Sequence, residues 1–311
     1  MHKRFIDLKK TFRSLRNHHF RLFYMGQSVS LVGTWMQQIA LSWLVYRMTN
    51  SPFLLGMVGF LGQIPTFFLS PIAGVIADRH NRHRMLLMTQ CSAMIQAFLL
   101  AILILTGKIT IEHIFTLSIF LGIITAFDTP IRQSFIIHMI ENKEDLGNAI
   151  ALNSSMVTAA RLIGPSIAGI LIALWGEGIC FLINGLSYLA VILSLFRMKI
   201  PPTPAGPKRH VLTELTEGFQ YAFNFFPIRM ILTLLSLVSL MGISIQTLMP
   251  VFAKDIFHGG PETLGFLTGA AGLGSLFGAI YLASRKNPAG LGRIIVVSTV
   301  LFRSEEHTSE L

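Results

Sequence analysis

Charged residues are scarce in this 311-residue chain. They make up 13% of it, about half the share of an ordinary soluble domain, whereas hydrophobic residues make up 52% and the mean hydropathy is +0.61. Apolar runs of about 20 residues recur along the chain, and runs of that length are typical of helices that cross a bilayer. The composition therefore argues against a soluble protein and predicts an all-α membrane protein.

Cysteine is almost absent, and several catalytic motifs are missing. Cys91 and Cys180 both fall inside predicted membrane helices, so no disulfide framework or metal cluster is expected. The chain has no G-x-x-x-x-G-K-[ST] for nucleotide hydrolysis, and no H-E-x-x-H or H-x-x-E-H for intramembrane zinc chemistry. We therefore expect no enzyme activity, no metal and no cofactor.

The apolar runs predict eight membrane helices and the start of a ninth. Their ranges are 20–46, 53–77, 85–106, 112–138, 148–175, 178–197, 228–252 and 262–284, with the ninth beginning at 293. The first six are expected to form a complete bundle, and the later helices to lack packing partners.

Basic residues lie in alternate connections between these helices. Of the 25 lysines and arginines, 20 fall in the N-terminal segment and in every second loop, and the opposite loops hold only Arg47, Lys108 and Lys254. Such asymmetry predicts a multi-pass protein of the cytoplasmic membrane with its N-terminus in the cytoplasm. Because the charges do not gather in one patch, the net charge of +10 does not indicate a nucleic-acid partner; the partner surface is the lipid bilayer.

The chain repeats itself across a proline-rich connection. Phe12–Asn17 aligns with Phe219–Asn224 at an offset of 207 residues, and Pro52–Gly56 aligns with Pro261–Gly265 at an offset of 209. Apolar spacing predicts an amphipathic helix ahead of each half. A repeat of this kind is typical of a transporter built from two bundles.

These observations divide the chain into five expected parts. The last nine residues match a translation of a sequencing-library adapter, and residues 294–302 alone are too few to cross a bilayer, so we expect the natural protein to continue beyond 302. The parts are an amphipathic cytoplasmic segment (1–19), an N-terminal six-helix bundle (20–197), a cytoplasmic linker (198–227), a partial C-terminal bundle with helices 7, 8 and the start of 9 (228–302), and a non-native tail (303–311).

A charged loop separates two of the apolar runs. Residues 74–84 read Gly-Val-Ile-Ala-Asp-Arg-His-Asn-Arg-His-Arg. The pattern G-x-x-x-D-R-x-x-R-x-R resembles the loop after helix 2 in the major facilitator superfamily of secondary transporters. Asn81 replaces the usual glycine, and asparagine tolerates a left-handed turn. The resemblance implies that Gly74 lets two helices approach, and that Asp78 holds the cytoplasmic side shut with Arg79, Arg82 or Arg132.

A second motif lies in the helix predicted at 148–175. Its Gly164, Pro165 and Gly169 resemble the helix-5 motif of exporters in the same superfamily. Small residues allow close backbone approach and proline bends the helix, which would supply a pivot and a tight seal. Simple helix packing is the alternative reading of the same residues.

Two ionisable residues lie inside predicted helices. Asp128 and Arg161 fall at similar depth, ~20 Å from the cytoplasmic end, on consecutive antiparallel helices. An ionised side chain at mid-helix costs about 2.5–3.5 kcal/mol, so we expect the two to pair. The pair either binds substrate or a proton, or it locks the two helices together.

Uncharged polar side chains inside the helices complete a predicted cavity. Unsatisfied amides are costly in hydrocarbon, so these residues need partners or water. Hydrogen bonds that serve only packing are the alternative. The expected cavity residues are Trp35, Gln38, Gln63, Asp128, Arg161 and Gln246.

Further segments narrow the resemblance. Asp128-Thr-Pro-Ile-Arg132, Gly33–Gln37 and Thr49–Pro52 resemble the exporter branch that includes the enterobactin exporter and the macrolide efflux pumps, often called transmembrane secretion effectors. The resemblance covers residues 12–302. It implies export of a small-molecule drug or siderophore driven by an ion gradient, with the proton as the expected coupling ion. A permease subunit powered by ATP and a non-transporting receptor with a transporter fold are the alternatives.

Overall fold

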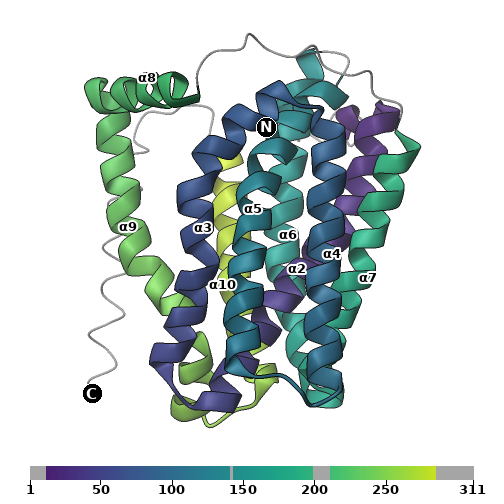
Figure 1. Ribbon diagram of the computed structural model, residues 1–311, viewed down its shortest axis with the longest axis vertical. Helices are drawn as coiled ribbons and strands as arrows, with labels where there is room; N and C mark the ends of the chain where they lie inside the picture. The colour runs from purple at the N-terminus through teal and green to yellow at the C-terminus, as the bar shows by residue number, and fades with distance from the viewer. Residues whose placement is uncertain (1–11, 141–142, 199–210, 285–311) are drawn as a thin grey trace, which may run out of the picture.

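The computed structural model describes residues 12–140, 143–198 and 211–284, and all regular structure in that part is helical (Figure 1). The predicted all-α class is therefore confirmed. The expectations for residues 1–11, 199–210, 285–302 and 303–311 lie outside the described residues. The long helices are α2 (His18–Thr49), α3 (Pro52–Arg79), α4 (Arg82–Leu105), α5 (Ile111–Met139), α6 (Leu146–Trp175), α7 (Glu177–Arg197), α8 (Val211–Asn224), α9 (Phe226–Val251) and α10 (Pro261–Ser284).

Three short helices complete the described chain: η1 (Arg13–Arg16), η2 (Lys143–Asp145) and the π-helix η3 (Phe252–Ile256). Five helices, α3 to α7, are long and apolar enough to cross a membrane within the described residues. α2 has 32 residues and also the length to cross, but it carries more polar side chains, several of them buried.

The turns between helices follow from their capping residues. Asn50 ends α2 in the left-handed conformation (φ 47°), and Ser51 accepts a hydrogen bond from the backbone N–H of Leu54 at the start of α3. Asn81 has φ −67°, so it does not adopt the left-handed conformation that asparagine tolerates. Its side chain instead caps α4 by accepting a hydrogen bond from the backbone N–H of Arg84 at 3.2 Å. An asparagine at this position thus starts a helix instead of supplying a turn.

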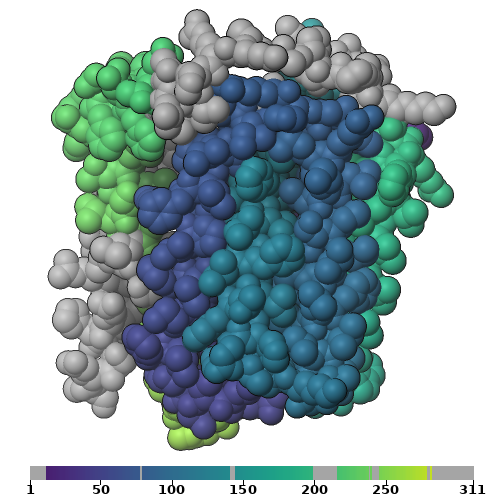
Figure 2. Space-filling view, in the orientation of Figure 1, coloured from purple at the N-terminus to yellow at the C-terminus, as the bar shows by residue number. Residues whose placement is uncertain are grey.

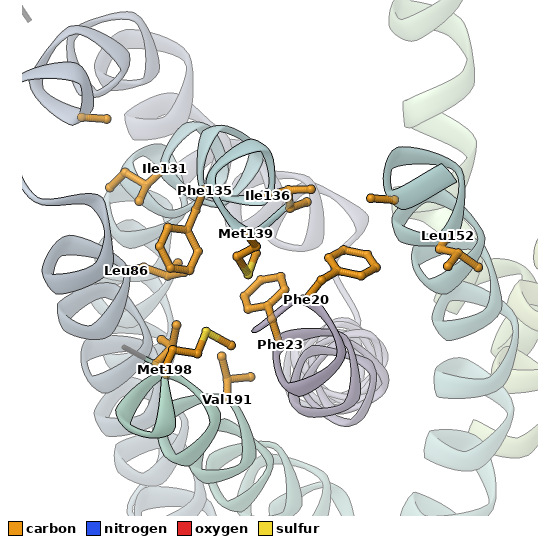
Figure 3. Packing of buried hydrophobic residues seen from close by; sticks show 13 residues of the cluster. Phe20, Phe23, Leu86, Ile131, Phe135, Ile136, Met139, Leu152, Val191 and Met198 are labelled. Carbon is orange, nitrogen blue, oxygen red and sulfur yellow. The ribbon is translucent and has the colours of Figure 1, made fainter. Parts of the chain in front are cut away.

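Helices α2 to α7 pack side by side around buried apolar clusters. Figure 3 shows the cluster at the end where α2, α4 and α6 begin, hereafter the basic end because Arg13, Arg82 and Arg132 lie there. Phe23 of α2 meets Phe135 of α5 edge-on, with ring centroids 6.2 Å apart. Because each helix contributes to the same cluster, its burial fixes their positions relative to one another.

The helices after residue 210 differ in how they pack. α8 lies at one side of the basic end, next to the start of α9, and α9 runs down that side of the molecule and meets α2, α3 and α10 toward the opposite end (Figure 1). Many apolar side chains of α9 are exposed, as expected for a helix without partners; they include Met230, Ile231, Leu235 and Leu237. Figure 2 shows α8 and the adjoining part of α9 at the edge of the face formed by α3, α4 and α5.

α10 packs closely against α6, contrary to the expectation that it lacks partners. A Cβ added to Gly265 would lie 2.6 Å from the carbonyl oxygen of Pro165 and 3.0 Å from the Cα of Gly169. Glycine is needed here because the two backbones are already in contact. The small residues of α6 therefore bind α10 to the preceding helices, which the hydropathy pattern alone does not indicate.

Candidate functional site

Asp128 lies in the half of α5 nearer to the basic end and is surrounded by donors. Its Oδ1 accepts hydrogen bonds from Thr89 (2.8 Å) and Gln90 (2.7 Å) of α4, and its Oδ2 lies 3.3 Å from the Nε of Arg132, one turn further along α5. The carboxylate is only 14% exposed. Three donors around one carboxylate compensate for the loss of water between the helices.

The expected ion pair between Asp128 and Arg161 is not formed. α5 packs on α3 and α4, whereas α6 packs on α2, α7 and α10, and the two helices hardly contact each other. Within the described part of the chain, Asp128 pairs with Arg132 instead. Position along a helix does not determine the direction in which a side chain points around the helix axis.

Arg161 lies at the middle of α6 and contacts the face of an aromatic ring of α2. Its Cζ atom lies 5.4 Å from the centre of the Trp35 ring, which is the geometry of a cation–π contact. Both residues are half-buried. The backbones approach closely at this level, because a Cβ on Gly164 would lie 2.6 Å from the Cβ of Trp35.

The other predicted cavity residues are exposed in the described chain. Gln38 of α2, Gln63 of α3 and Gln246 of α9 have exposed side chains, and no hydrogen bond between described residues joins them. α9 approaches α3 one turn before Gln63, because a Cβ built on Gly59 would lie 3.8 Å from the side chain of Thr247. The structure therefore brings Trp35 and Arg161 together but leaves the three glutamines separate.

The predicted gating residues also differ in whether they contact another helix. Gly164, Pro165 and Gly169 are buried in close helix contacts, whereas no described atom lies within 4 Å of a Cβ built on Gly74. The side chain of Asp78 lies outside the described part of the chain.

Arg82 connects the loop after α3 to α5. It donates to the Nε2 of His138 at 2.8 Å, while the Nδ1 of this histidine lies 2.9 Å from the carbonyl oxygen of Ser134. These contacts join the start of α4 to the last turns of α5.

Sequence reasoning missed a buried network of amides. Asn184 of α7 donates to Gln37 of α2 at 2.7 Å, Gln37 donates to Gln96 of α4 at 3.0 Å, and Gln96 donates to the carbonyl of Leu117 in α5 at 3.3 Å. The three amide side chains are at most 3% exposed. Isolated amides inside apolar runs were the available signal, and the network shows that they join four helices rather than line a cavity.

A polar cluster at the end opposite to the basic end was also missed. Tyr46 of α2 donates to Asp255 of the π-helix η3, and Lys254 lies over the Tyr46 ring and donates to Asn50 at 2.5 Å. π-Helical turns occur preferentially at functional positions. Only the fold brings these residues together, since about 200 positions separate them in sequence.

Hollows on the described surface do not coincide with these clusters. One open hollow is lined by Glu217, Tyr221 and Phe225 of the α8 region, and another by Pro52, Phe53 and Phe60 of α3. The described residues contain no group of three His, Cys, Asp or Glu that could hold a metal ion.

Comparison with known proteins agrees with these features. The chain is 28% identical to the staphyloferrin A transporter of Staphylococcus aureus over 286 residues, which cover 91% of this chain and 71% of that protein. It is 21% identical to macrolide efflux protein A of Streptococcus pyogenes, with 91% and 70% covered, and 24% identical to the enterobactin exporter EntS of Shigella boydii, with 90% and 67% covered.

Charges held between membrane helices are uncommon and often mark functional positions. Residues 9–304 match the family described as transmembrane secretion effector. The chain belongs to this family, a branch of the major facilitator superfamily. It is therefore a multi-pass membrane protein of a transporter family and not an enzyme, and a transporter of this family takes a small-molecule substrate.

Proposed function

We propose that the protein exports a small molecule, of the drug or siderophore class, across the cytoplasmic membrane by using an ion gradient. The match of residues 9–304 to the secretion effector family carries this proposal. The sequence has no nucleotide-binding motif with which this chain itself could hydrolyse ATP, and the proton is our candidate for the coupling ion.

We propose further that α2 to α7 are the N-terminal bundle (20–197) and that α9 and α10 belong to a second, C-terminal bundle (228–302). The linker (198–227) then contains α8 on the cytoplasmic surface. Two observations support this arrangement: the repeated sequence at offsets of 207 and 209 residues, and the basic residues gathered at one end of the helices. On this basis the basic end, the segment 1–19 and the N-terminus face the cytoplasm.

The substrate pathway is proposed to run between the two bundles. Trp35, Gln38, Gln63, Arg161 and Gln246 lie on α2, α3, α6 and α9, each of which contacts a helix of the other proposed bundle. Polar side chains within membrane helices are costly unless a partner, water or substrate reaches them. Asp128 contributes charge inside the first bundle, where uptake of a proton would weaken its contact with Arg132.

Efflux from cells tests this function. The gene, as it stands in its source genome, is expressed in bacteria that lack their own efflux pumps, and retention of a panel of siderophores and macrolides is measured. We expect lower retention of at least one compound, and loss of this effect when a protonophore collapses the gradient at unchanged ATP.

Two results would contradict the proposal. Export that continues without the gradient but stops when ATP is depleted would favour a permease subunit. A protein that reaches the membrane and moves no compound, yet binds one, would favour a receptor with a transporter fold.

The charged loop is proposed to close the cytoplasmic side through Asp78. Replacing Asp78 by Asn removes its charge and should favour the inward-open state, because a gate residue acts through the balance of two states. We expect the efflux rate to fall at normal expression. An unchanged rate would remove Asp78 from the gate, and Glu217→Gln on the exposed surface of α8 serves as the control for loss of one negative charge.

A further inference from the structure

Arg161 is a charged residue at the middle of a membrane helix, and an aromatic ring lies at the same depth on a neighbouring helix. It lies about halfway along α6 (Leu146–Trp175), and Trp35 lies about halfway along α2 (His18–Thr49). The 5.4 Å contact between them therefore falls near the centre of the membrane. Substrate sites of secondary transporters lie at this depth, at the boundary between the two repeats.

The charge of Arg161 has no carboxylate partner in the described chain. Two other arginines of the long helices have one: Arg47 lies 2.6 Å from Glu177, and Arg132 lies 3.3 Å from Asp128. No hydrogen bond from Arg161 to any described residue is formed. None of its nitrogen atoms is fully buried without a partner. Because these atoms make no hydrogen bond to a described residue, they are accessible from outside the protein.

The contact with Trp35 uses none of the N–H donors of the guanidinium as hydrogen bonds, and no described residue accepts from them. A guanidinium stacks through its flat face, whereas its N–H donors point outward in the plane and match the two oxygens of a carboxylate. The indole supports and orients this fork without neutralising it. The pair is therefore arranged to receive an acceptor that carries negative charge.

The surrounding backbone places this fork where three helices meet. A Cβ on Gly164 would contact Trp35 of α2, and a Cβ on Gly272 of α10 would lie 3.0 Å from the carbonyl oxygen of Arg161 and 2.8 Å from the Cα of Leu162. Arg161 thus lies between a helix of the first half and one that follows the linker. Movement of α10 relative to α6 would change access to its side chain.

We propose that the exported compound is an anion, and that Arg161 binds its negative group while Trp35 contacts an adjacent flat or apolar part. Carboxylates, phenolates and related oxyanions fit this site, whereas compounds whose only charge is an amine do not. The inference rests on the proposed export function and narrows the substrate class. Among the compounds that similar proteins carry, it favours acidic ones over basic ones.

Two probes of matched shape and opposite charge test this inference. 2-Naphthoate and 2-naphthylmethylammonium are titrated by calorimetry into the full chain in lipid nanodiscs. We expect naphthoate to bind at least tenfold more tightly than the ammonium. Arg161→Met should weaken naphthoate at least tenfold, Arg161→Lys only a few-fold, and Trp35→Leu should weaken both probes.

The matched control is Arg21→Met, which removes an exposed arginine of α2 and should leave both affinities unchanged. If Arg161→Met does not fold, Arg161→Gln takes its place. The comparison of the two probes on the unchanged chain then still tests whether the site prefers an anion. Equal or tighter binding of the ammonium, no binding of naphthoate, or an unchanged naphthoate affinity in the Arg161 variants would overturn the inference.

The efflux assay separates this inference from the function on which it rests. If the cells export only cationic compounds, the exporter function stands and the assignment of an anionic substrate fails. If no compound is exported at all, the proposed function itself fails. Export of anions that is lost in Arg161→Met and retained in Arg21→Met supports both.

Discussion

At the scale of single residues, the charges inside the helices are compensated in different ways. Asp128 is held by two neutral donors and by Arg132 on its own helix, whereas Arg161 is supported by an aromatic face alone. The first arrangement satisfies the charge within the protein. The second leaves the N–H edge of a cation available, which is why the binding proposal concerns Arg161 rather than Asp128.

Arg132→Met should destabilise the protein more than the double change Arg132→Met with Asp128→Asn. The single change leaves a carboxylate with 14% exposure without its cation, and we expect a loss of about 1–3 kcal/mol, part of which the double variant recovers. Thermal unfolding in detergent measures both variants against Arg21→Met. Equal losses in the single and double variants would show that the pair contributes no coupling.

Gln37→Leu should cost about 1–3 kcal/mol, because both Gln96 and Asn184 then lose a buried partner. The adjacent Gln38 is exposed, so Gln38→Leu is a matched control that should change the unfolding free energy by less than about 0.5 kcal/mol. The two melting curves are compared under the same conditions. Equal effects would mean that the network adds no stability beyond ordinary side-chain packing.

At the scale of helices, close approach depends on glycines at particular positions. α10 contains five glycines, and they differ in their surroundings: Gly265 faces the backbone of α6, whereas Gly274 has no neighbour within 4 Å. The same residue type therefore has a packing role at one position and no such role nine residues later. Composition alone does not distinguish the two.

Gly265→Ala should separate α10 from α6 and destabilise the protein by about 1–3 kcal/mol, because backbone atoms on α6 cannot move aside as a flexible side chain would. Gly274→Ala should be neutral or stabilising by about 0.5–1 kcal/mol, since alanine favours the helix. Unfolding midpoints of the two variants give the comparison. A Gly265→Ala protein as stable as Gly274→Ala would contradict the close contact.

At the scale of the whole molecule, the cluster of Tyr46, Asn50, Lys254 and Asp255 connects α2 to the segment between α9 and α10. It joins the first six long helices to the later ones at the end opposite to the basic end. Buried Ala253 and Leu264 continue this contact into the apolar cluster around Met36 and Ile172. The position of α10 is therefore fixed by polar contacts at one end and by glycine contacts along its length.

Tyr46→Phe should loosen this connection, because it removes one hydrogen bond to a carboxylate, worth about 1.5 kcal/mol or more. Amide hydrogen exchange in Phe252–Ile256 should become roughly tenfold faster, as expected from a loss of this size. Tyr221→Phe, on the exposed surface of α8, should leave exchange in η3 unchanged. Unchanged exchange in the Tyr46 variant would show that packing alone holds η3.

The sequence by itself determined where the helices lie. Predicted spans such as 20–46 and 262–284 agree with α2 (His18–Thr49) and α10 (Pro261–Ser284) to within three residues. This information is local, because the length of an apolar run and the capping residues at its ends decide where a membrane helix begins and ends.

Only the tertiary structure decided which residues meet. Position along a helix gives the depth of Asp128 and Arg161, but each residue turns about 100° around the helix axis, and depth says nothing of that direction. Asp128 and Arg132 are one turn apart and share a face, so they pair, while Arg161 faces Trp35. Which helices are neighbours depends on packing between distant segments, and a periodicity along one helix does not encode it.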